Sequence, residues 1–197
     1  VYDNNDWVVP VDEVLDFHFE SDGKIWAALS SGGVVRYTGS AWVRINQGNS
    51  GLPSNNVREI DVDEADNVWF LLPGQVARFD GNTWTTFSND NSAVPDGALT
   101  TLYIDARQNY WLGTLENGVV KFNSEDWTVA EAVYDMTNSG LPENGISAIT
   151  GDGDTAIWIA TTAGVAKFDG TDWTTYDTLR TDQVRAISAG EYAWFAT

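Results

Sequence analysis

Residues 66–87 read DNVWFLLPGQVARFDGNTWTTF, and this stretch contains both kinds of tryptophan that repeat along the chain. Trp69 lies in an apolar run, whereas Trp84 ends a short polar turn. All ten tryptophans of the 197-residue chain fall into two such sets, at intervals of 35 to 47 residues. The first set is Trp26, Trp69, Trp111, Trp158 and Trp194, and the second is Trp7, Trp42, Trp84, Trp127 and Trp173. Intervals of about 40 residues indicate an internal repeat.

Each repeat contains short runs rich in β-branched and aromatic residues, with Gly, Asp and Asn between the runs. Apolar runs precede the first set of tryptophans, at residues 14–19, 57–62, 99–104, 146–151 and 184–189. Residues 75–79 and 83–87 show the two further runs that follow Trp69. Alternating runs bounded by turn residues are typical of β-strands. Four strands in about 40 residues predict an all-β chain built of β-propeller blades.

Residues 49–57, followed by Asp66-Asn67-Val68-Trp69 and by residues 74–81, resemble the two-component regulator propeller repeat. Residues 111–114 and 138–142 repeat two of these signatures, so the resemblance covers essentially the whole chain. It departs at Pro73, where the usual Gly/Thr turn is altered. The resemblance implies a propeller fold and a sensor input domain in which ligand binding shifts a domain arrangement. Such motifs specify a fold far more strongly than a function.

The spacing predicts one propeller domain over residues 1–197, with five four-stranded blades. The expected blades cover approximately residues 8–42, 43–84, 85–127 and 128–173, and a composite blade combines 174–197 with 1–7. The two chain ends hold complementary parts of one blade, so we expect Tyr2 to Val8 to form its outer strand beside Trp194. The alternative is a slice of a longer array of repeats.

The net charge of −19 disfavours nucleic acid and anionic membrane surfaces as partners. The chain has no cysteine, which excludes thiol catalysis and cysteine-ligated metals. No apolar run reaches 18 residues, so we expect no membrane insertion by this segment. The single histidine, His18, aligns with varied polar residues of other repeats, which favours a structural position over a catalytic one.

Acidic turns are the candidate metal sites. Asp61, Asp63 and Asp66, and the turn at residues 152–154, could offer oxygen ligands to calcium. Equivalent turns lack this pattern, which favours ordinary turn chemistry and no cofactor. Four basic residues recur directly before an aromatic residue, which favours a structural ion pair or packing on a tryptophan. They are Arg36, Arg78, Lys121 and Lys167.

No nucleophile elbow, phosphate loop or metal-binding motif is present, so the sequence predicts that the chain is not an enzyme. A pair of carboxylates of the kind that glycoside hydrolases use remains an open alternative. A propeller lyase would be expected to use histidines, and the chain has one.

The connectors that follow the second set of tryptophans differ in length, and loops on a rigid scaffold often carry function. The three long connectors cover residues 43–56, 85–98 and 128–145 and are expected to form one side of a rim. The candidate ligand-binding residues are Arg44, Asn46, Gln47, Asn56, Asn89, Asp90, Asp96, Tyr134 and Asn144. These polar and aromatic side chains suit a glycan, a peptide or a protein.

The sequence therefore predicts a non-catalytic binding module, periplasmic or extracellular in a bacterium, that resembles the sensor input of two-component systems. A structural or adhesive module of a cell-surface protein is the main alternative. A propeller hydrolase or lyase is the third reading.

Overall fold

The computed structural model describes residues 13–123, 126–153, 156–176, 184, 186–190 and 193–196. These residues form strands, turns and bends, which confirms the all-β prediction. None of them lies in a helix that could span a membrane. The chain divides into two compact units, Val1–Phe87 and Ser88–Thr197.

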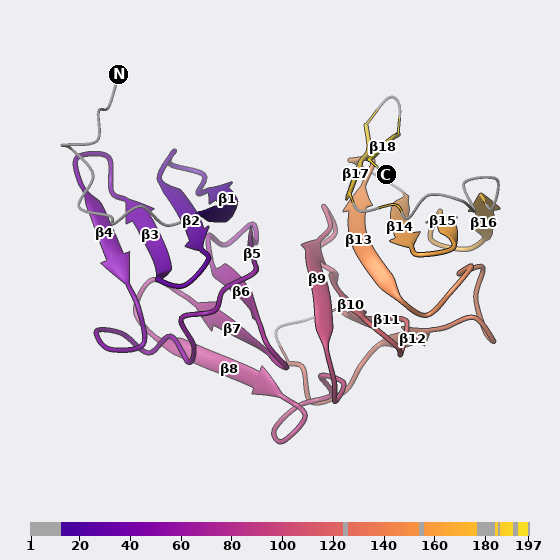
Figure 1. Cartoon of the computed structure of the whole chain (residues 1–197), viewed down its shortest axis with the longest axis horizontal. Coiled ribbons are helices and arrows are strands. Elements are labelled where there is room, and N and C mark those ends of the chain that lie inside the picture. The colour runs from indigo at the N-terminus through magenta and orange to yellow at the C-terminus, as the bar shows by residue number, and fades with distance from the viewer. Residues whose placement is uncertain are drawn as a thin grey trace. The chain divides into compact units, whose positions relative to one another are not determined.

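The first unit contains two antiparallel sheets of four strands, in which each strand pairs with the next one in sequence (Figure 1). The first blade consists of β1 (Val14–Phe19), β2 (Ile25–Leu29), β3 (Gly33–Tyr37) and β4 (Trp42–Ile45). The second blade consists of β5 (Glu59–Val62), β6 (Val68–Leu72), β7 (Gln75–Phe79) and β8 (Trp84–Ser88). A hydrogen bond of 2.7 Å from the Ile60 N–H to Asp16 Oδ2 joins β5 to β1. The two blades therefore meet along their first strands.

The second unit repeats this architecture. The third blade consists of β9 (Leu99–Ile104), β10 (Tyr110–Thr114), β11 (Val119–Phe122) and β12 (Ala132–Tyr134). The fourth consists of β13 (Ile146–Gly151), β14 (Ile157–Thr161), β15 (Gly164–Phe168) and β16 (Trp173–Tyr176). A two-stranded sheet of β17 (Ala186–Ser188) and β18 (Trp194–Ala196) follows. The first strand of the fourth blade, β13, contacts both β9 and β17.

Aromatic residues of neighbouring blades form the core of each unit. In the first unit the fully buried Trp26 meets Phe70 edge-on, with ring centroids 5.4 Å apart. In the second unit Trp111 meets Phe168 edge-on at 6.1 Å. Leu141, from the connector before β13, is buried in the same cluster. Burial of one such leucine side chain stabilises the fold by roughly 1.5–3 kcal/mol.

Each of the four blades carries a contact set of an acid, a tryptophan and a cation, which we call the turn-acid set. In three blades the indole N–H donates to the carboxylate that opens the preceding turn, in the pairs Trp26–Glu20, Trp69–Asp63 and Trp111–Asp105. In the fourth blade Lys167 Nζ lies 3.7 Å from Asp152 Oδ2. The cations Arg36, Arg78, Lys121 and Lys167 lie 5.1 to 5.8 Å from the tryptophan ring centroids of their own blades. The prediction of packing on tryptophan is therefore confirmed.

The outer strand of the third blade differs from the prediction. Trp84 and Trp173 lie in outer strands as expected, whereas Trp127 precedes β12. Trp127 still stacks on Phe122, with centroids 4.3 Å apart and rings 2° from parallel. Four residues lie between Trp127 and Ala132, the first residue of β12, and the last of them, Glu131, donates its backbone N–H to Lys121 O at 2.8 Å. Tryptophan occupies the corresponding place in the fourth blade.

The blade boundaries, expected approximately at the second set of tryptophans, stay predictions. The strands β4, β8 and β16 continue a few residues beyond those tryptophans. In the third blade the whole of β12 lies beyond Trp127. The expected outer strand Tyr2 to Val8 lies outside the described residues, so the five-blade count and the single closed domain stay predictions.

Candidate functional site

A cavity of about 210 Å³ lies between the third and fourth blades, within the second unit. It opens beside the β9–β10 and β13–β14 turns and is bordered by the beginning of the β15–β16 turn. Its lining consists of Tyr103, Asp105, Ala106, Arg107, Asn109, Trp111, Lys121, Glu131, Tyr134, Gly151, Gly153, Ala156, Ile157, Phe168 and Gly170. The lining therefore combines aromatic rings, charged groups and glycines from two blades.

The β9–β10 turn is held together by the carboxylate of Asp105. Its Oδ1 accepts the backbone N–H groups of Arg107 and Asn109, each at 2.9 Å. The Asn109 amide donates to the same carboxylate at 2.8 Å, and Gln108 adopts the left-handed conformation with φ 61°. An aspartate at the start of a turn satisfies the N–H groups that follow it. The Asp105 carboxylate is therefore occupied by the turn and by Trp111.

Aromatic rings form the inner wall of the cavity. Tyr134 stacks on Trp111 with centroids 6.1 Å apart and rings 17° from parallel, and it also contacts Phe168 at 5.4 Å. Burial, and to a smaller extent the Glu131 carboxylate, raise the pKa of Tyr134 above its ordinary value. The phenol is therefore neutral at physiological pH and can donate a hydrogen bond.

An ion pair lies at the side of the cavity, where Lys121 Nζ is 2.9 Å from Glu131 Oε2. Glu131 can make this contact because Trp127 is displaced from the outer strand. In the first blade the corresponding cation, Arg36, pairs with the turn acid Glu20 instead. The third blade thus brings a carboxylate into the cavity from the residue directly before its outer strand.

Glycines give the cavity its shape on the side of the fourth blade. A Cβ at Gly151 would lie 2.5 Å from the Tyr103 hydroxyl oxygen, so the tyrosine fits only against a glycine. Gly170 has φ 99°, and a Cβ there would lie 3.6 Å from Arg107 Nη1. Arg107 is an exposed residue at the tip of its turn.

The corresponding turns of the first unit are joined to each other. The backbone N–H and the hydroxyl of Ser21 donate to the Asp66 carboxylate, at 2.9 and 2.5 Å. This link ties the β1–β2 turn to the β5–β6 turn. Ala106 takes the position of Ser21 in the third blade and has no hydroxyl to form such a link. Ala106 is exposed and lines the cavity.

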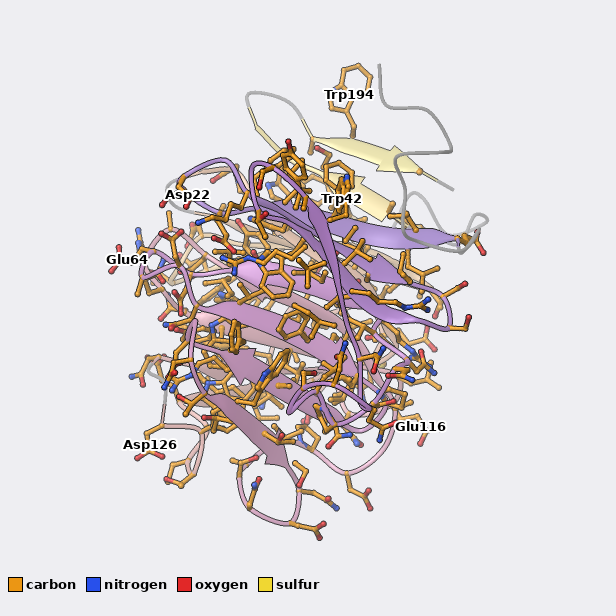
Figure 2. The ribbon with its side chains drawn as sticks, turned by 90° about the vertical axis from the view of Figure 1, so that its left-hand side faces the viewer. Asp22, Trp42, Glu64, Glu116, Asp126 and Trp194 are labelled. Atoms are coloured by element: carbon orange, nitrogen blue, oxygen red, sulfur yellow. The ribbon has the colours of Figure 1, made fainter. Side chains whose placement is uncertain are left out.

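The sequence-predicted site residues lie mostly at the other end of the sheets. Because the strands alternate in direction, the β9–β10 turn and the connector from β12 to β13 lie at opposite ends of their sheets. Figure 2 shows this alternation for two successive turns of the second unit. Glu116, between β10 and β11, and Asp126, between β11 and β12, lie on opposite sides of the view. Tyr134 is the one predicted residue that lines the cavity.

Several predicted residues hold the connectors together through internal hydrogen bonds. Asn46 Oδ1 accepts the Gly48 N–H, Gln47 Nε2 donates to Pro53 O, and Asn144 Oδ1 accepts the Met136 N–H. Arg44 Nε donates to Gly32 O at 3.0 Å. The exposed predicted residues are Gln47, Asn56, Asn89, Asp90 and Asp96, and of these Gln47 also holds its connector through the bond to Pro53. The structure therefore divides the predicted set into connector-holding and solvent-facing residues.

The three calcium candidates do not converge on one point. Asp63 accepts hydrogen bonds from Asn67 and Trp69, and Asp66 accepts them from Ser21. Asp61 Oδ1 lies 3.4 Å from His18 Nδ1. No group of three metal-ligating side chains occurs among the described residues, and Asp154 of the other acidic turn lies outside them.

His18 lies half-buried where the first two blades meet, as expected for a structural position. Burial lowers its pKa, although the Asp16 carboxylate opposes this shift.

Sequence reasoning missed two charged residues of the cavity. Arg107 is the basic counterpart of Asp22 and Ala65 in the equivalent turns, and that difference between repeats was the available signal. Glu131 was hidden because Trp127 was taken to begin the outer strand. Its position emerges only from the observed pairing of β11 with β12.

No protein family matches the sequence, and no curated protein sequence matches it. Solved structures do match. The extracellular domain assigned to the hybrid two-component system BT3049 of B. thetaiotaomicron is 23% identical with a TM-score of 0.73, over 91% of this chain and 25% of that one. The corresponding domain of BT4673 is 18% identical with a TM-score of 0.75, over 94% of this chain and 28% of that one.

The chain thus spans about a quarter of the length of these two domains. Streptogramin B lyase is 16% identical with a TM-score of 0.74, over 96% of this chain and 64% of that one. At such identities the likeness shows the fold, which is that of a β-propeller. The likeness to the two-component system domains agrees with the resemblance to the two-component regulator propeller repeat.

The prediction that the chain is not an enzyme is corrected by these comparisons. Streptogramin B lyase and virginiamycin B lyase share the fold with TM-scores of 0.74 and 0.71. Lyases thus match this chain as well as sensor domains do. The fold therefore gives no ground for excluding catalysis, and a missing motif does not supply one.

Proposed function

We propose that this chain is an extracellular or periplasmic binding module of a bacterium whose ligand occupies the cavity between the third and fourth blades. One observation carries this proposal: the cavity combines the Tyr134 ring, the Lys121–Glu131 ion pair and the exposed Arg107. Small-ligand sites are typically concave, with apolar walls and a few convergent polar groups. A short peptide or a glycan unit is of the size and chemistry that such a lining can contact.

The role that fits this site is that of a sensor input. The similar BT3049 and BT4673 domains are extracellular parts of two-component systems, which supports the proposed location and role. YCF48, solved with the D1 peptide bound, also shares the fold with a TM-score of 0.64 and 16% identity. A bound ligand shifts a domain arrangement only as far as its affinities for the two arrangements differ.

A second candidate role is contact with a protein partner through the connectors. Asn89 and Asp90 in the connector after β8 are exposed, and their side chains have no hydrogen-bond partner among the described residues. PorZ, described as a bacterial surface component of the type-IX secretion system, shares the fold with a TM-score of 0.72 and 15% identity. For this role we retain the solvent-facing residues Asn56, Asn89, Asp90 and Asp96 as proposed contacts.

The test uses the substitution Ala106→Trp, which places an indole beside the cavity from an exposed turn position. Ala65→Trp is the control, because it adds the same side chain to an exposed alanine one position further along the equivalent turn of the second blade. Peptides selected from a phage-displayed library and hits from a glycan array are measured against the wild type and both variants. We expect binding to fall at least tenfold in Ala106→Trp and to persist in Ala65→Trp.

Binding that survives Ala106→Trp contradicts the cavity as the site. If the same binding is then lost in a variant with Asn89→Ala and Asp90→Ala, the connectors carry the function instead. The melting temperature of each variant shows whether it is folded.

A further inference from the structure

We infer that the ligand of this cavity presents a carboxylate and that Arg107 binds it. The inference rests on the proposed function and adds to it the chemical class of the ligand. Three features of the second unit support it: a guanidinium without a partner in the described part of that unit, an open space next to that group, and lining acids that already have partners.

The side chain of Arg107 has no ion pair, hydrogen bond or ring contact with any residue in the described part of the chain; its backbone N–H alone is bonded, to Asp105. Every other lysine and arginine in that part is engaged. Those residues are Lys24, Arg36, Arg44, Arg58, Arg78, Lys121 and Lys167. Within the described ranges of a chain whose net charge is −19, Arg107 is thus the exception among the cations, and that exception needs a reason.

The second feature is the space beside the guanidinium. A Cβ at Gly170 would already lie in van der Waals contact with Arg107 Nη1, at 3.6 Å, so a longer side chain there would cover the nitrogen. The φ of 99° favours glycine at this position. The turn geometry of the fourth blade thus keeps one side of the guanidinium open.

The third feature is that the cavity's own acids are occupied. Asp105 accepts hydrogen bonds from its turn and from the Trp111 indole, and Glu131 pairs with Lys121. The charges of the four ionisable side chains in the lining, two acidic and two basic, therefore cancel, while the chain as a whole is strongly acidic. An incoming anion meets one cation, Arg107, whose side chain has no partner among the residues that the structure describes.

A guanidinium binds a carboxylate through two parallel hydrogen bonds, which gives orientation as well as affinity. A phosphate dianion carries more charge into an acidic protein, and phosphate sites typically combine several donors. One unpaired arginine therefore fits a single carboxylate better. The two common sources are the carboxylate of a peptide and that of a uronic acid, and Tyr134 and Tyr103 provide ring surface for the rest of either ligand.

The experiment measures calorimetric binding of matched acidic and neutral probes to the full chain. The peptide probes are N-acetylated tetrapeptides, prepared as free acids and as carboxamides. The sugar probes are digalacturonic acid and its methyl ester. We expect an acid from one of these two sources to bind, and its neutral form to bind about tenfold more weakly, which corresponds to about 1.4 kcal/mol.

Arg107→Gln should weaken binding of the acid by about the same factor and leave the weaker binding of the neutral form unchanged. Arg58→Gln, which removes an exposed arginine of the first unit, is the control and should change neither. Equal binding of acid and neutral probes, or binding of neither acid, overturns the carboxylate inference. If neutral probes bind and Ala106→Trp blocks them, the proposed site stands without this inference; if Ala106→Trp leaves binding intact, the proposed site itself fails.

Discussion

Asp80 opens the turn between β7 and β8 and accepts hydrogen bonds from the backbone of Asn82 and from both the backbone and the hydroxyl of Thr83. The Thr83 hydroxyl is the largest of the influences that lower the pKa of Asp80 to about 2. Because this value lies below the ordinary 3.8, the folded state holds fewer protons than the unfolded state at acidic pH. The stabilisation is therefore present above pH 3.8 and is lost as the pH falls toward 2.

Removing the hydroxyl in Thr83→Ala should raise the pKa of Asp80 from about 2 toward 3.8. Two backbone hydrogen bonds remain, so we expect an intermediate value. An NMR titration of the Asp80 carboxyl carbon measures the shift. Thr85→Ala in the next strand is the control and should leave the midpoint in place; an unchanged midpoint in Thr83→Ala would show that the hydroxyl has no such influence.

The titration of His18 makes the stability of the fold depend on pH at mildly acidic values. Burial is the largest cause of its lowered pKa, while the Asp16 carboxylate acts in the other direction. The unfolded chain then binds a proton more readily than the folded chain, so stability rises with pH through this range. We expect the melting temperature to fall as the pH drops below about 6.5.

The variant His18→Gln lacks this titration and should show a smaller fall in melting temperature between pH 7 and pH 5.5. Scanning calorimetry of both proteins at the two pH values makes the comparison. An equal fall in both proteins would assign the pH dependence to other groups, such as Asp16, whose pKa is raised by burial.

At the scale of elements, the connectors before the second and fourth blades pack closely against the tryptophan of the outer strand that follows. A Cβ at Gly51 would lie 2.7 Å from the Trp84 indole, and one at Gly140 would lie 2.6 Å from Trp173 Cβ. The equivalent connector residue before the third blade is Ala93, and there the tryptophan is displaced from the outer strand. The glycine of the sequence Asn-Ser-Gly-Leu-Pro, which occurs at residues 49–53 and 138–142, is therefore required for packing against the strand tryptophan.

Gly140→Ala should lower the free energy of unfolding by about 1–3 kcal/mol, because an added carbon in a packed place forces its neighbours apart. Urea unfolding measures the change. Ala93→Gly is the reciprocal control and should cost about 1 kcal/mol or less, since it removes only one methyl group and adds backbone freedom. Equal effects of the two substitutions would contradict the link to the tryptophan.

The strands were predictable because their apolar alternation and turn residues act locally, and both are visible along the sequence. The displaced outer strand of the third blade was not, because Trp127 occupies the expected place in the repeat while stacking on Phe122 from a turn. Residues that meet only through sheet pairing, such as Lys121 and Glu131, have no local signal. The ion pair in the cavity forms through such sheet pairing, so Glu131 was not predicted as a site residue although Tyr134 was.

At the scale of the whole molecule, the charge of −19 is a source of self-repulsion in the compact state. Salt screens this repulsion, with a Debye length of about 30 Å at 0.01 M and about 8 Å at 0.15 M. We expect the melting temperature to rise by several degrees when sodium chloride is raised from 0.01 to 0.15 M. A fall would mean that specific ion pairs, such as Arg36 with Glu20, outweigh the overall repulsion.

A chelator test separates the two readings of the acidic turns. Asp63 and Asp66 already accept hydrogen bonds from neighbouring side chains, so turn chemistry accounts for them without a metal. We expect EDTA at about 1 mM to leave the melting temperature unchanged. This concentration is high enough to remove calcium even from weak protein sites. A drop that added calcium reverses would establish a metal site.

Every contact of the turn-acid set lies within one blade, since the acid comes from the first turn of the sheet and the tryptophan and the cation come from the two strands that follow. Duplication of a blade-length segment of the gene therefore copies this source of stability intact, and the new copy needs no matching change elsewhere. The cavity behaves differently under duplication, because its lining comes from two successive blades. Recombination can thus change the number of blades without loss of these contacts. The cavity is copied only when the segment that encodes both of its blades is duplicated as one piece.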